Sequence, residues 1–265
     1  WNGNEAIWFT SPYRGTQPVF NITLADGKIT RITEGDYDMG PLQLQNGVLV
    51  SGMMSMARPT EVASVNMATG EFSMITDVNG HIYESIKMGK SVERYTKTKD
   101  GKDLQSWIIY PPDFDPAKKY PTLLYCKGGP QGSLGQGWSY RWNYQMMAAN
   151  GYIVVAVNRR GNSGFGSYWR EQISGDYGGK NIQDYLDAID DMAKEPYVDK
   201  DRLGAVGASY GGYSVFYLAG MHNKRFKAFV SHCGVYNTIA EYGSTEEYWY
   251  PNKDYQGAPW DKPQP

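Results

Sequence analysis

Gly207-Ala208-Ser209-Tyr210-Gly211-Gly212 follows an apolar stretch, residues 203–206, that is typical of a strand, and it precedes a helical pattern at residues 213–221. Glycine at 207 and 211 allows a turn in which any side chain would crowd the backbone. Such a turn places the serine hydroxyl at the carboxyl edge of a sheet, where the start of the next helix can face a developing oxyanion. The pattern can arise by chance, but the strand before it and the helix after it favour a nucleophile elbow. We therefore predict that Ser209 is a nucleophile.

Three histidines, His81, His222 and His232, are the candidates for the base that a serine nucleophile needs. In a sheet with such an elbow, an acid and then a histidine follow the serine along the chain. Only His222 and His232 follow Ser209, and each comes too early to leave room for an acid-bearing loop. We interpret both as structural, with His232 nearer the site. The sequence thus predicts a nucleophile without its base.

Composition indicates an ordinary globular protein, with 41% hydrophobic and 20% charged residues and a formal net charge of −2. There is no basic run, zinc-like Cys/His spacing, phosphate-binding loop or long apolar stretch. We therefore expect no nucleic-acid partner, no metal, no cofactor and no membrane span. Two cysteines, Cys126 and Cys233, do not identify a redox compartment, and the chain begins at Trp1. Periplasmic, secreted and cytoplasmic locations all stay open.

Residues 1–95 contain a weak repeat. Residues 7–38 can be aligned with residues 48–79, with short alternating strands and a turn at Asp-Gly or Thr-Gly in each. A repeat of this length, built from short strands, is typical of a four-stranded propeller blade. We predict that residues 1–95 are the C-terminal blades of a β-propeller, and a pair of unrelated hairpins is the alternative.

Residues 96–265 alternate between strand and helix patterns, which predicts an α/β fold. Continuous apolar strands, as in a parallel sheet covered on both faces, are expected at 104–110, 122–126, 152–157, 203–206 and 228–231. Helices are expected at 140–150, 182–194 and 213–221. In the second helix the apolar residues share one face, and we interpret its aspartates as a solvated face: Asp184, Asp187, Asp190 and Asp191.

Four segments now carry a family resemblance. They are Leu124-Tyr125-Cys126-Lys127-Gly128-Gly129-Pro130, Asn158-Arg159-Arg160-Gly161-Asn162-Ser163-Gly164-Phe165-Gly166, Val198-Asp199-Lys200-Asp201-Arg202-Leu203 and Gly207-Ala208-Ser209-Tyr210-Gly211-Gly212-Tyr213. In order and spacing over residues 97–240 they resemble serine peptidases of the prolyl oligopeptidase family, on the dipeptidyl peptidase IV and acylaminoacyl peptidase side. The resemblance implies an α/β-hydrolase domain preceded by β-propeller blades.

The resemblance also implies roles for single residues. Ser209 would form the acyl-enzyme, and the backbone N–H of Tyr210 would be one oxyanion donor. Acylaminoacyl-type relatives use a backbone N–H of the double glycine as the second donor, so we expect Gly129 in that role. Dipeptidyl peptidase IV relatives have a tyrosine where this chain has Lys127, which leaves Lys127 as a weaker candidate near substrate. Arg160 is expected to organise its loop.

A group of aromatic residues falls where the family builds the wall of its first specificity pocket. By resemblance they would bind substrate, although aromatic residues are equally ordinary packing: Tyr236, Tyr242, Tyr248, Trp249 and Tyr250.

In the family the triad Asp and His lie downstream of where this sequence stops. We therefore expect residues 96–265 to be an incomplete hydrolase domain that lacks both, and the 265-residue chain to be inactive alone, with only the modest acceleration that binding and an oxyanion hole provide. An exposed sheet edge would favour self-association, so a homo-oligomer is expected as a possible state.

Three functions stay open at this stage. The first is a serine peptidase acting on short peptides, of the dipeptidyl- or acylaminoacyl-peptidase type, through a Ser209 acyl-enzyme. The second keeps the hydrolase and takes a carboxylic ester as substrate. The third is a noncatalytic module in which propeller blades bind a partner. The sequence does not decide which peptides the first would cut.

Overall fold

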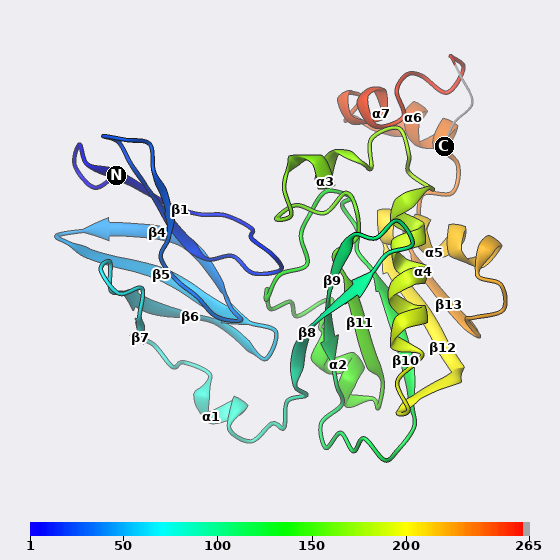
Figure 1. Cartoon of the computed structure of the whole chain (residues 1–265), viewed down its shortest axis with the longest axis horizontal. Coiled ribbons are helices and arrows are strands. Elements are labelled where there is room, and N and C mark those ends of the chain that lie inside the picture. The colour runs from blue at the N-terminus through cyan, green and yellow to red at the C-terminus, as the bar shows by residue number, and fades with distance from the viewer. Residues whose placement is uncertain (262–265) are drawn as a thin grey trace.

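The computed structural model describes residues 1–261, and Figure 1 shows them in two parts that lie side by side. The N-terminal part consists of two antiparallel sheets in which each strand pairs with the next along the chain. The first sheet contains β1 (Ala6–Thr10), β2 (Val19–Thr23) and β3 (Ile29–Arg31). The second contains β4 (Asp38–Gln45), β5 (Val48–Ser55), β6 (Arg58–Val65) and β7 (Phe72–Met74).

The weak sequence repeat corresponds to equivalent strands of these two sheets. Its first anchors, residues 7–10 and 48–51, lie in β1 and β5. Its last anchors contain Gly27 and Gly70, which have φ values of 69° and 76° in the turns from β2 to β3 and from β6 to β7. The left-handed backbone at both turns explains why glycine recurs there.

The second part is built on a six-stranded sheet in the order β13-β12-β10-β11-β9-β8. Four neighbouring strands are parallel, and the pairs β11–β9 and β9–β8 are antiparallel. The strands are β8 (Ser91–Lys97), β9 (Asp103–Ile109), β10 (Tyr120–Cys126), β11 (Ile153–Val157), β12 (Val198–Ala208) and β13 (Ala228–His232). The five predicted strands are thus present, with β8 in addition.

Helices cover both faces of this sheet (Figure 1). One face packs against α2 (Tyr144–Ala149), and the other packs against α4 (Lys180–Met192) and α5 (Tyr210–Met221). Short helices lie in the connections and after β13: α1 (Gly80–Tyr83), α3 (Ser167–Glu171), α6 (Thr238–Ser244) and α7 (Trp249–Asp254). Within residues 1–261 no helix is long and apolar enough to cross a bilayer.

Alternate residues of β9 show how the sheet is buried on both sides. Leu104 and Ile108 join the cluster under α4 and α5, whereas Trp107 and Ile109 join the cluster under α2. All four are at most 1% exposed. A strand buried on both faces has no polar side, which is why the sequence shows a continuous apolar run there.

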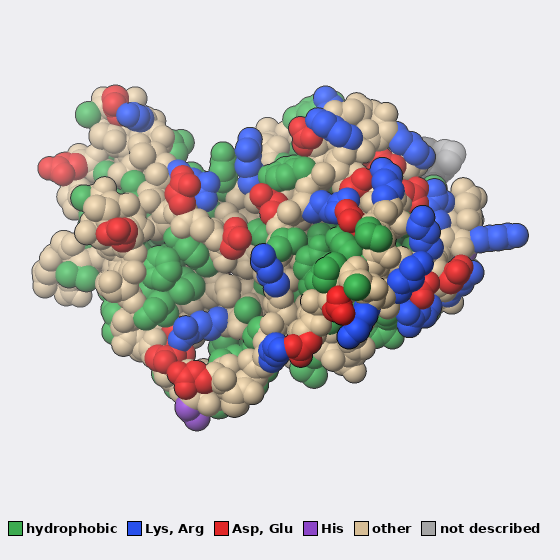
Figure 2. Space-filling view, turned by 60° about the horizontal axis from the view of Figure 1, so that its bottom comes forward, with side chains coloured by type: hydrophobic (Ala, Val, Ile, Leu, Met, Phe, Trp, Pro, Cys, Tyr) green, Lys and Arg blue, Asp and Glu red, His purple; other side chains and the backbone are tan. Residues whose placement is uncertain are grey.

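The two parts meet at a few points. The indole N–H of Trp107 on β9 donates to the carbonyl of Gly15, at 3.0 Å. Met56, in the β5–β6 turn, packs in the same cluster as Trp107, and its N–H donates to the Gln136 side chain at 3.2 Å. β8 pairs with β9 along its whole length, so the expected boundary at residue 95 falls within a strand and the six-stranded sheet starts at Ser91. Figure 2 shows hydrophobic side chains gathered in one area of each part, with charged side chains around both areas.

Asp38 is a buried carboxylate at this junction. It begins β4 and is 8% exposed. It lies against the loop that follows β10, because a Cβ atom on Gly135 would come within 3.0 Å of its Oδ1 atom. Burial raises the pKa of Asp38 to about 6, against the opposing effect of backbone N–H groups of Gln136, Gln17 and Gly137.

The aspartates of α4 correct an expectation, because they are not a solvated face. Asp184 is fully buried and pairs with Arg160, and Asp187 is 8% exposed and accepts the N–H of Lys99. The other two are partly buried ion-pair partners, Asp190 of Arg225 and Asp191 of Arg94. The aspartates are covered by other polar groups, namely the 97–102 turn and several arginines. A helix face covered in this way has the same polar sequence as a face exposed to solvent.

Candidate active site

Ser209 lies at the turn between β12 and α5. Its φ and ψ angles are 57° and −125°, a conformation that non-glycine residues rarely adopt, and its side chain is exposed. A Cβ atom on Gly207 would lie 2.8 Å from the carbonyl oxygen of Cys126, and one on Gly211 would overlap that oxygen. Gly212 is confined as well, because its Cβ would lie 2.6 Å from the Cα of Gly234. The glycines thus permit the strand, turn and helix to pack tightly enough to present the serine.

The backbone of Ser209 is held from both sides, but no histidine reaches its hydroxyl. Its N–H donates to the carbonyl of His232 at 2.9 Å, and its carbonyl accepts the N–H of Tyr213. The described residues include all three histidines. His222 accepts the N–H of Phe226 through Nδ1, and the His232 ring packs edge-on against Trp142. These contacts are consistent with the structural role expected for both histidines, which stays a prediction.

The loop after β10 passes beside the serine. A Cβ atom on Gly128 would lie 3.5 Å from the Cβ of Ser209 and 2.7 Å from the carbonyl oxygen of Ala208. Gly129 has a φ of 130°, in the region that favours glycine, and precedes a cis bond to Pro130. Gly129, Ser209 and Tyr210 line one cavity. The two expected oxyanion donors therefore lie with the nucleophile, and their role stays a prediction.

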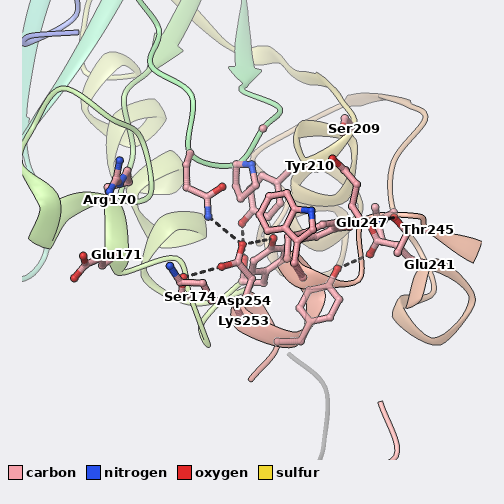
Figure 3. A pocket seen from close by; sticks show the side chains of 18 residues that line it. Arg170, Glu171, Ser174, Ser209, Tyr210, Glu241, Thr245, Glu247, Lys253 and Asp254 are labelled. Atoms are coloured by element: carbon pink, nitrogen blue, oxygen red, sulfur yellow. Dashed lines mark hydrogen bonds between the residues drawn. The ribbon is translucent and has the colours of Figure 1, made fainter. Parts of the chain in front are cut away.

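The cavity beside Ser209 has a volume of about 600 Å³ and is mainly polar. Figure 3 shows its labelled side chains, with Ser209 and Tyr210 at one side and Arg170 and Glu171 at the other. Its walls come from the Gly129–Pro130 loop, from residues 170–177 and from the segment 235–255.

Asp254 is the main polar anchor of the cavity wall. Its carboxylate is 3% exposed and accepts hydrogen bonds from Gln131 Nε2 at 2.9 Å, Ser174 Oγ at 2.8 Å and Tyr177 OH at 3.0 Å (Figure 3). Its carbonyl also accepts the N–H of Gly175. One carboxylate therefore ties α7 to the loop next to Pro130 and to the segment between α3 and α4.

Glu241 is a second acidic group in the wall. Its two carboxylate oxygens accept the hydroxyls of Tyr250 and Tyr255. Burial, and then the hydrogen bond to Glu241, raise the pKa of both tyrosines, so they stay protonated donors. This arrangement orients α6 and α7 against each other at the rim.

The residues expected to bind substrate lie partly outside the cavity beside Ser209. Tyr236 and Tyr248 are 85% and 51% exposed, and the Tyr242 hydroxyl donates to Asn252; none of the three lines the cavity. Trp249 and Tyr250 do line it. The ammonium group of Lys127 lies next to Gly132, outside the lining, and burial followed by the charge of Arg159 lowers its pKa.

Sequence reasoning missed Asp254, Tyr177 and Gln131. Nothing in the local sequence marks Asp254, because its donors are distant in the chain. The position of Gln131 could have been used to predict its role. It directly follows the loop expected to supply an oxyanion donor, so its side chain would be expected to line a cavity beside that loop.

Comparisons with known proteins show which proteins this chain is similar to. Residues 138–265 match the profile of the Prolyl oligopeptidase family. The chain is 47% identical to dipeptidyl-peptidase 5 of Porphyromonas gingivalis over 98% of its own length and 38% of that protein. It is 46% identical to dipeptidyl-peptidase 5 of Porphyromonas endodontalis over 97% of its length and 37% of that protein. The chain thus spans less than half the length of these curated relatives.

The fold is also similar to a solved structure. Acylaminoacyl peptidase of Pyrococcus horikoshii superposes with a TM-score of 0.88 at 26% identity, covering 99% of this chain and 41% of that one. This likeness covers the N-terminal sheets as well as the six-stranded sheet.

Proposed function

The chain belongs to the prolyl oligopeptidase family, and from this premise we propose that the natural protein carrying it is a serine exopeptidase that acts on short peptides through an acyl-enzyme on Ser209. The observation that carries the proposal is Ser209 itself, exposed on a strained turn at the mouth of a cavity. Relatives named dipeptidyl-peptidase 5 favour release of dipeptides over release of single acylated residues.

The geometry supports a defined course of reaction. The Ser209 oxygen attacks the carbonyl carbon of the scissile bond, and the carbonyl oxygen becomes negatively charged. The backbone N–H groups of Tyr210 and Gly129 are the proposed donors to that oxygen, where a hydrogen bond gains most strength in the transition state. A general base takes the proton of the Ser209 hydroxyl during the attack and returns it to the amine as the C–N bond breaks. Water then hydrolyses the ester of the acyl-enzyme, which releases the carboxylic acid and restores the Ser209 hydroxyl.

The base for this reaction is not among the described histidines, since none reaches the Ser209 hydroxyl. We therefore expect the 265-residue chain by itself to show only the residual acceleration, roughly 10³ to 10⁴ over water, that is left when a triad is incomplete.

We propose further that the N-terminal sheets are blades of a β-propeller that restricts entry to short peptides. The four antiparallel strands β4 to β7 have the strand number and order of one blade. The equivalence of β1, β2 and β3 with β5, β6 and β7 supports a second blade. A homo-oligomer stays a prediction, and sedimentation of the natural protein tests it.

The test compares four chromogenic substrates in the natural protein: a dipeptidyl amide with a free amino terminus, the same amide with a blocked amino terminus, an acylated single-residue amide and a simple ester. We expect the free dipeptidyl amide to be cleaved fastest and Ser209→Ala to abolish cleavage. A fluorophosphonate should label Ser209. Preference for the ester, or no label at Ser209, would contradict the proposal.

A further inference from the structure

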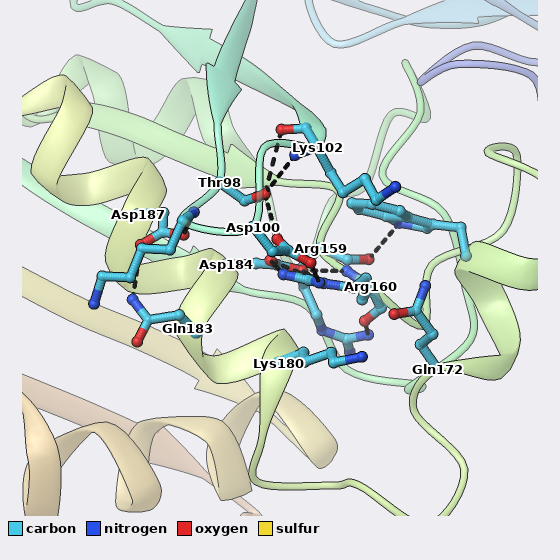
Figure 4. A network of polar contacts seen from close by, with 12 residues as sticks. Thr98, Asp100, Lys102, Arg159, Arg160, Gln172, Lys180, Gln183, Asp184 and Asp187 are labelled. Carbon is cyan, nitrogen blue, oxygen red and sulfur yellow. Dashed lines mark hydrogen bonds and ion pairs between the residues drawn. The ribbon is translucent and has the colours of Figure 1, made fainter.

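Two adjacent arginines follow β11, and the structure gives them different partners. Arg160 forms ion pairs with Asp184 and with Asp100. Figure 4 shows the polar network around both arginines. Arg159 is fully buried, and within residues 1–261 no carboxylate lies at ion-pair distance from it. A buried cation without such a partner is costly, so its other contacts require an explanation.

The guanidinium of Arg159 is held by neutral oxygens. It donates to the carbonyl of Pro130 at 3.0 Å, to the carbonyl of Lys127 at 3.4 Å and to that of Arg160 at 2.8 Å. Its Nε also donates to the hydroxyl of Tyr185 at 3.3 Å, and the same hydroxyl accepts the N–H of Lys127 at 2.9 Å. The loop beside Ser209 is therefore attached to Arg159 both directly and through Tyr185.

Two of these carbonyls bracket the double glycine, Gly128 and Gly129. In a planar trans peptide the C=O and the N–H point in opposite directions. When the Lys127 carbonyl turns towards Arg159, the Gly128 N–H turns away from it. Consistent with this, the Gly128 nitrogen lies 3.2 Å from the position that a Cβ on Gly211 would occupy, against the elbow. Arg159 thus sets the orientation of the loop that includes the expected donor Gly129.

The same guanidinium also contacts the other side of the site. It lies 4.7 Å from the centroid of the Tyr210 ring, and the Tyr210 hydroxyl donates to the carbonyl of Tyr177 at 2.6 Å. Tyr210 supplies the second expected donor through its backbone N–H. The Arg159 guanidinium therefore contacts both parts of the chain that are expected to donate to the oxyanion, the Gly128–Gly129 loop and Tyr210. Because no described carboxylate pairs with it, its charge also favours negative charge developing nearby.

We propose that Arg159 is a positioning residue that holds the Gly128–Gly129 loop and Tyr210 in the geometry that stabilises the oxyanion. This inference rests on the proposed function. The proposed role affects the tetrahedral state and not the bound substrate. Loss of Arg159 should therefore change substrate binding little, while turnover and the affinity for a tetrahedral adduct should fall in parallel.

The test uses Arg159→Met, Arg159→Lys and Tyr185→Phe in the natural protein, with steady-state kinetics and the inhibition constant of a peptide boronate, which forms a tetrahedral adduct with serine. We expect Arg159→Met to lower kcat by roughly 10- to 100-fold, somewhat less than the loss of an oxyanion donor, and to leave KM within a few fold. Boronate affinity should fall in parallel with kcat/KM. Arg159→Lys should recover part of both, and Tyr185→Phe should show a smaller parallel loss.

Arg94→Met is the matched control, because Arg94 is a partly buried arginine whose pairs with Asp191 and Glu195 lie outside the cavity lining. It should lower thermal stability without changing kcat or boronate affinity. The inference is overturned if a folded Arg159→Met or Tyr185→Phe protein retains wild-type kcat and boronate affinity, or if only KM changes. If wild-type protein neither cleaves peptides nor labels at Ser209, the proposed function fails instead.

Discussion

The six-stranded sheet and the N-terminal sheets are stabilised in different ways. In the six-stranded sheet, β9 and β11 are buried on both faces by two large apolar clusters. The N-terminal sheets share one small cluster around Val19, Met39, Leu49 and Val65, and leave apolar side chains such as Ile29 exposed. Only the six-stranded sheet contains neighbouring parallel strands, whose carboxyl ends lie at one edge of the sheet. Ser209 lies at that edge.

This contrast teaches where a change should matter. At the elbow, backbone packs on backbone with no space for one added methyl group. At the junction between the two parts, the contacts are a few side-chain hydrogen bonds and a backbone hydrogen bond from Arg14 to Gly164. Substitutions at the elbow should therefore affect activity and folding strongly, while substitutions at the junction should have small and condition-dependent effects.

The largest effect is expected for Ser209→Ala in the natural protein. Removal of the nucleophile should lower kcat by roughly 10⁵- to 10⁶-fold with little change in stability, because the side chain is exposed. Cleavage of a dipeptidyl amide and thermal unfolding measure the two quantities. Substantial remaining turnover would show that the parallel-strand edge is not the site of the chemistry.

Gly211→Ala should come next, and Gly220→Ala is its control in the same helix. The added Cβ at 211 overlaps the Cys126 carbonyl, so we expect a loss of at least about 3 kcal/mol or no folded protein. Nothing lies within 4 Å of a Cβ at 220, so alanine there should stabilise the helix by about 0.5 to 1 kcal/mol. Urea unfolding measures both, and equal effects would contradict the packing argument.

A smaller effect is expected for Asp254→Asn in the cavity wall. An amide has one acceptor oxygen where the carboxylate has two, so a donor among Gln131, Ser174 and Tyr177 loses its partner. We expect a loss of about 1 to 3 kcal/mol in stability and a higher KM for peptides. Glu246→Gln, which removes an exposed charge between α6 and α7, should change neither, and an equal change in both variants would refute the role of Asp254.

The smallest effect should appear at Asp38 and depend on pH. The pKa of Asp38 is about 6 in the folded protein, above its unfolded value, so the folded state binds the proton more tightly. The contribution to stability is therefore complete below about pH 4 and is lost as the pH rises through 6. Asp38→Asn should be more stable than wild type at pH 7.5 by about 1 to 2 kcal/mol, since lost charge-assisted hydrogen bonds offset part of the gain.

Urea unfolding at pH 4.5 and pH 7.5 measures this difference. The advantage of Asp38→Asn should shrink at the lower pH. A difference that is the same at both pH values would mean that the Asp38 carboxylate does not titrate at the junction.

The sequence predicted the six-stranded sheet and its elbow well, because both depend on local patterns. Continuous apolar runs mark β9 to β12, and the glycines around Ser209 mark the turn. The aspartates of α4 were misinterpreted for the same reason: hydrophobic periodicity describes one helix, while the burial of Asp184 depends on Arg160, which is distant in the chain.

The cavity was less predictable, because its polar side chains bind partners that are distant in the sequence. Asp254 meets Gln131, and Arg159 meets Lys127, only after the sheet has formed. The expected aromatic wall was placed by resemblance, and in the structure Tyr236 and Tyr248 are exposed outside the cavity lining while Tyr250 lines the cavity. Tyr236 and Tyr248 lie in the segments that precede α6 and α7, where the direction of a side chain depends on tertiary contacts and not on residue type.

The β5–β6 turn has a consequence for how the chain is made. Met56 packs in the same cluster as Trp107 and donates its N–H to Gln136, which is 80 positions later in the sequence. At a synthesis rate of 5 to 20 residues per second, roughly 4 to 16 s pass between the two. During that time the tip of the hairpin lacks the Gln136 side chain that binds the Met56 N–H in the folded protein. The contact between Met56 and Gln136 can therefore form only after both parts of the chain have been synthesised, well after the β5–β6 hairpin itself.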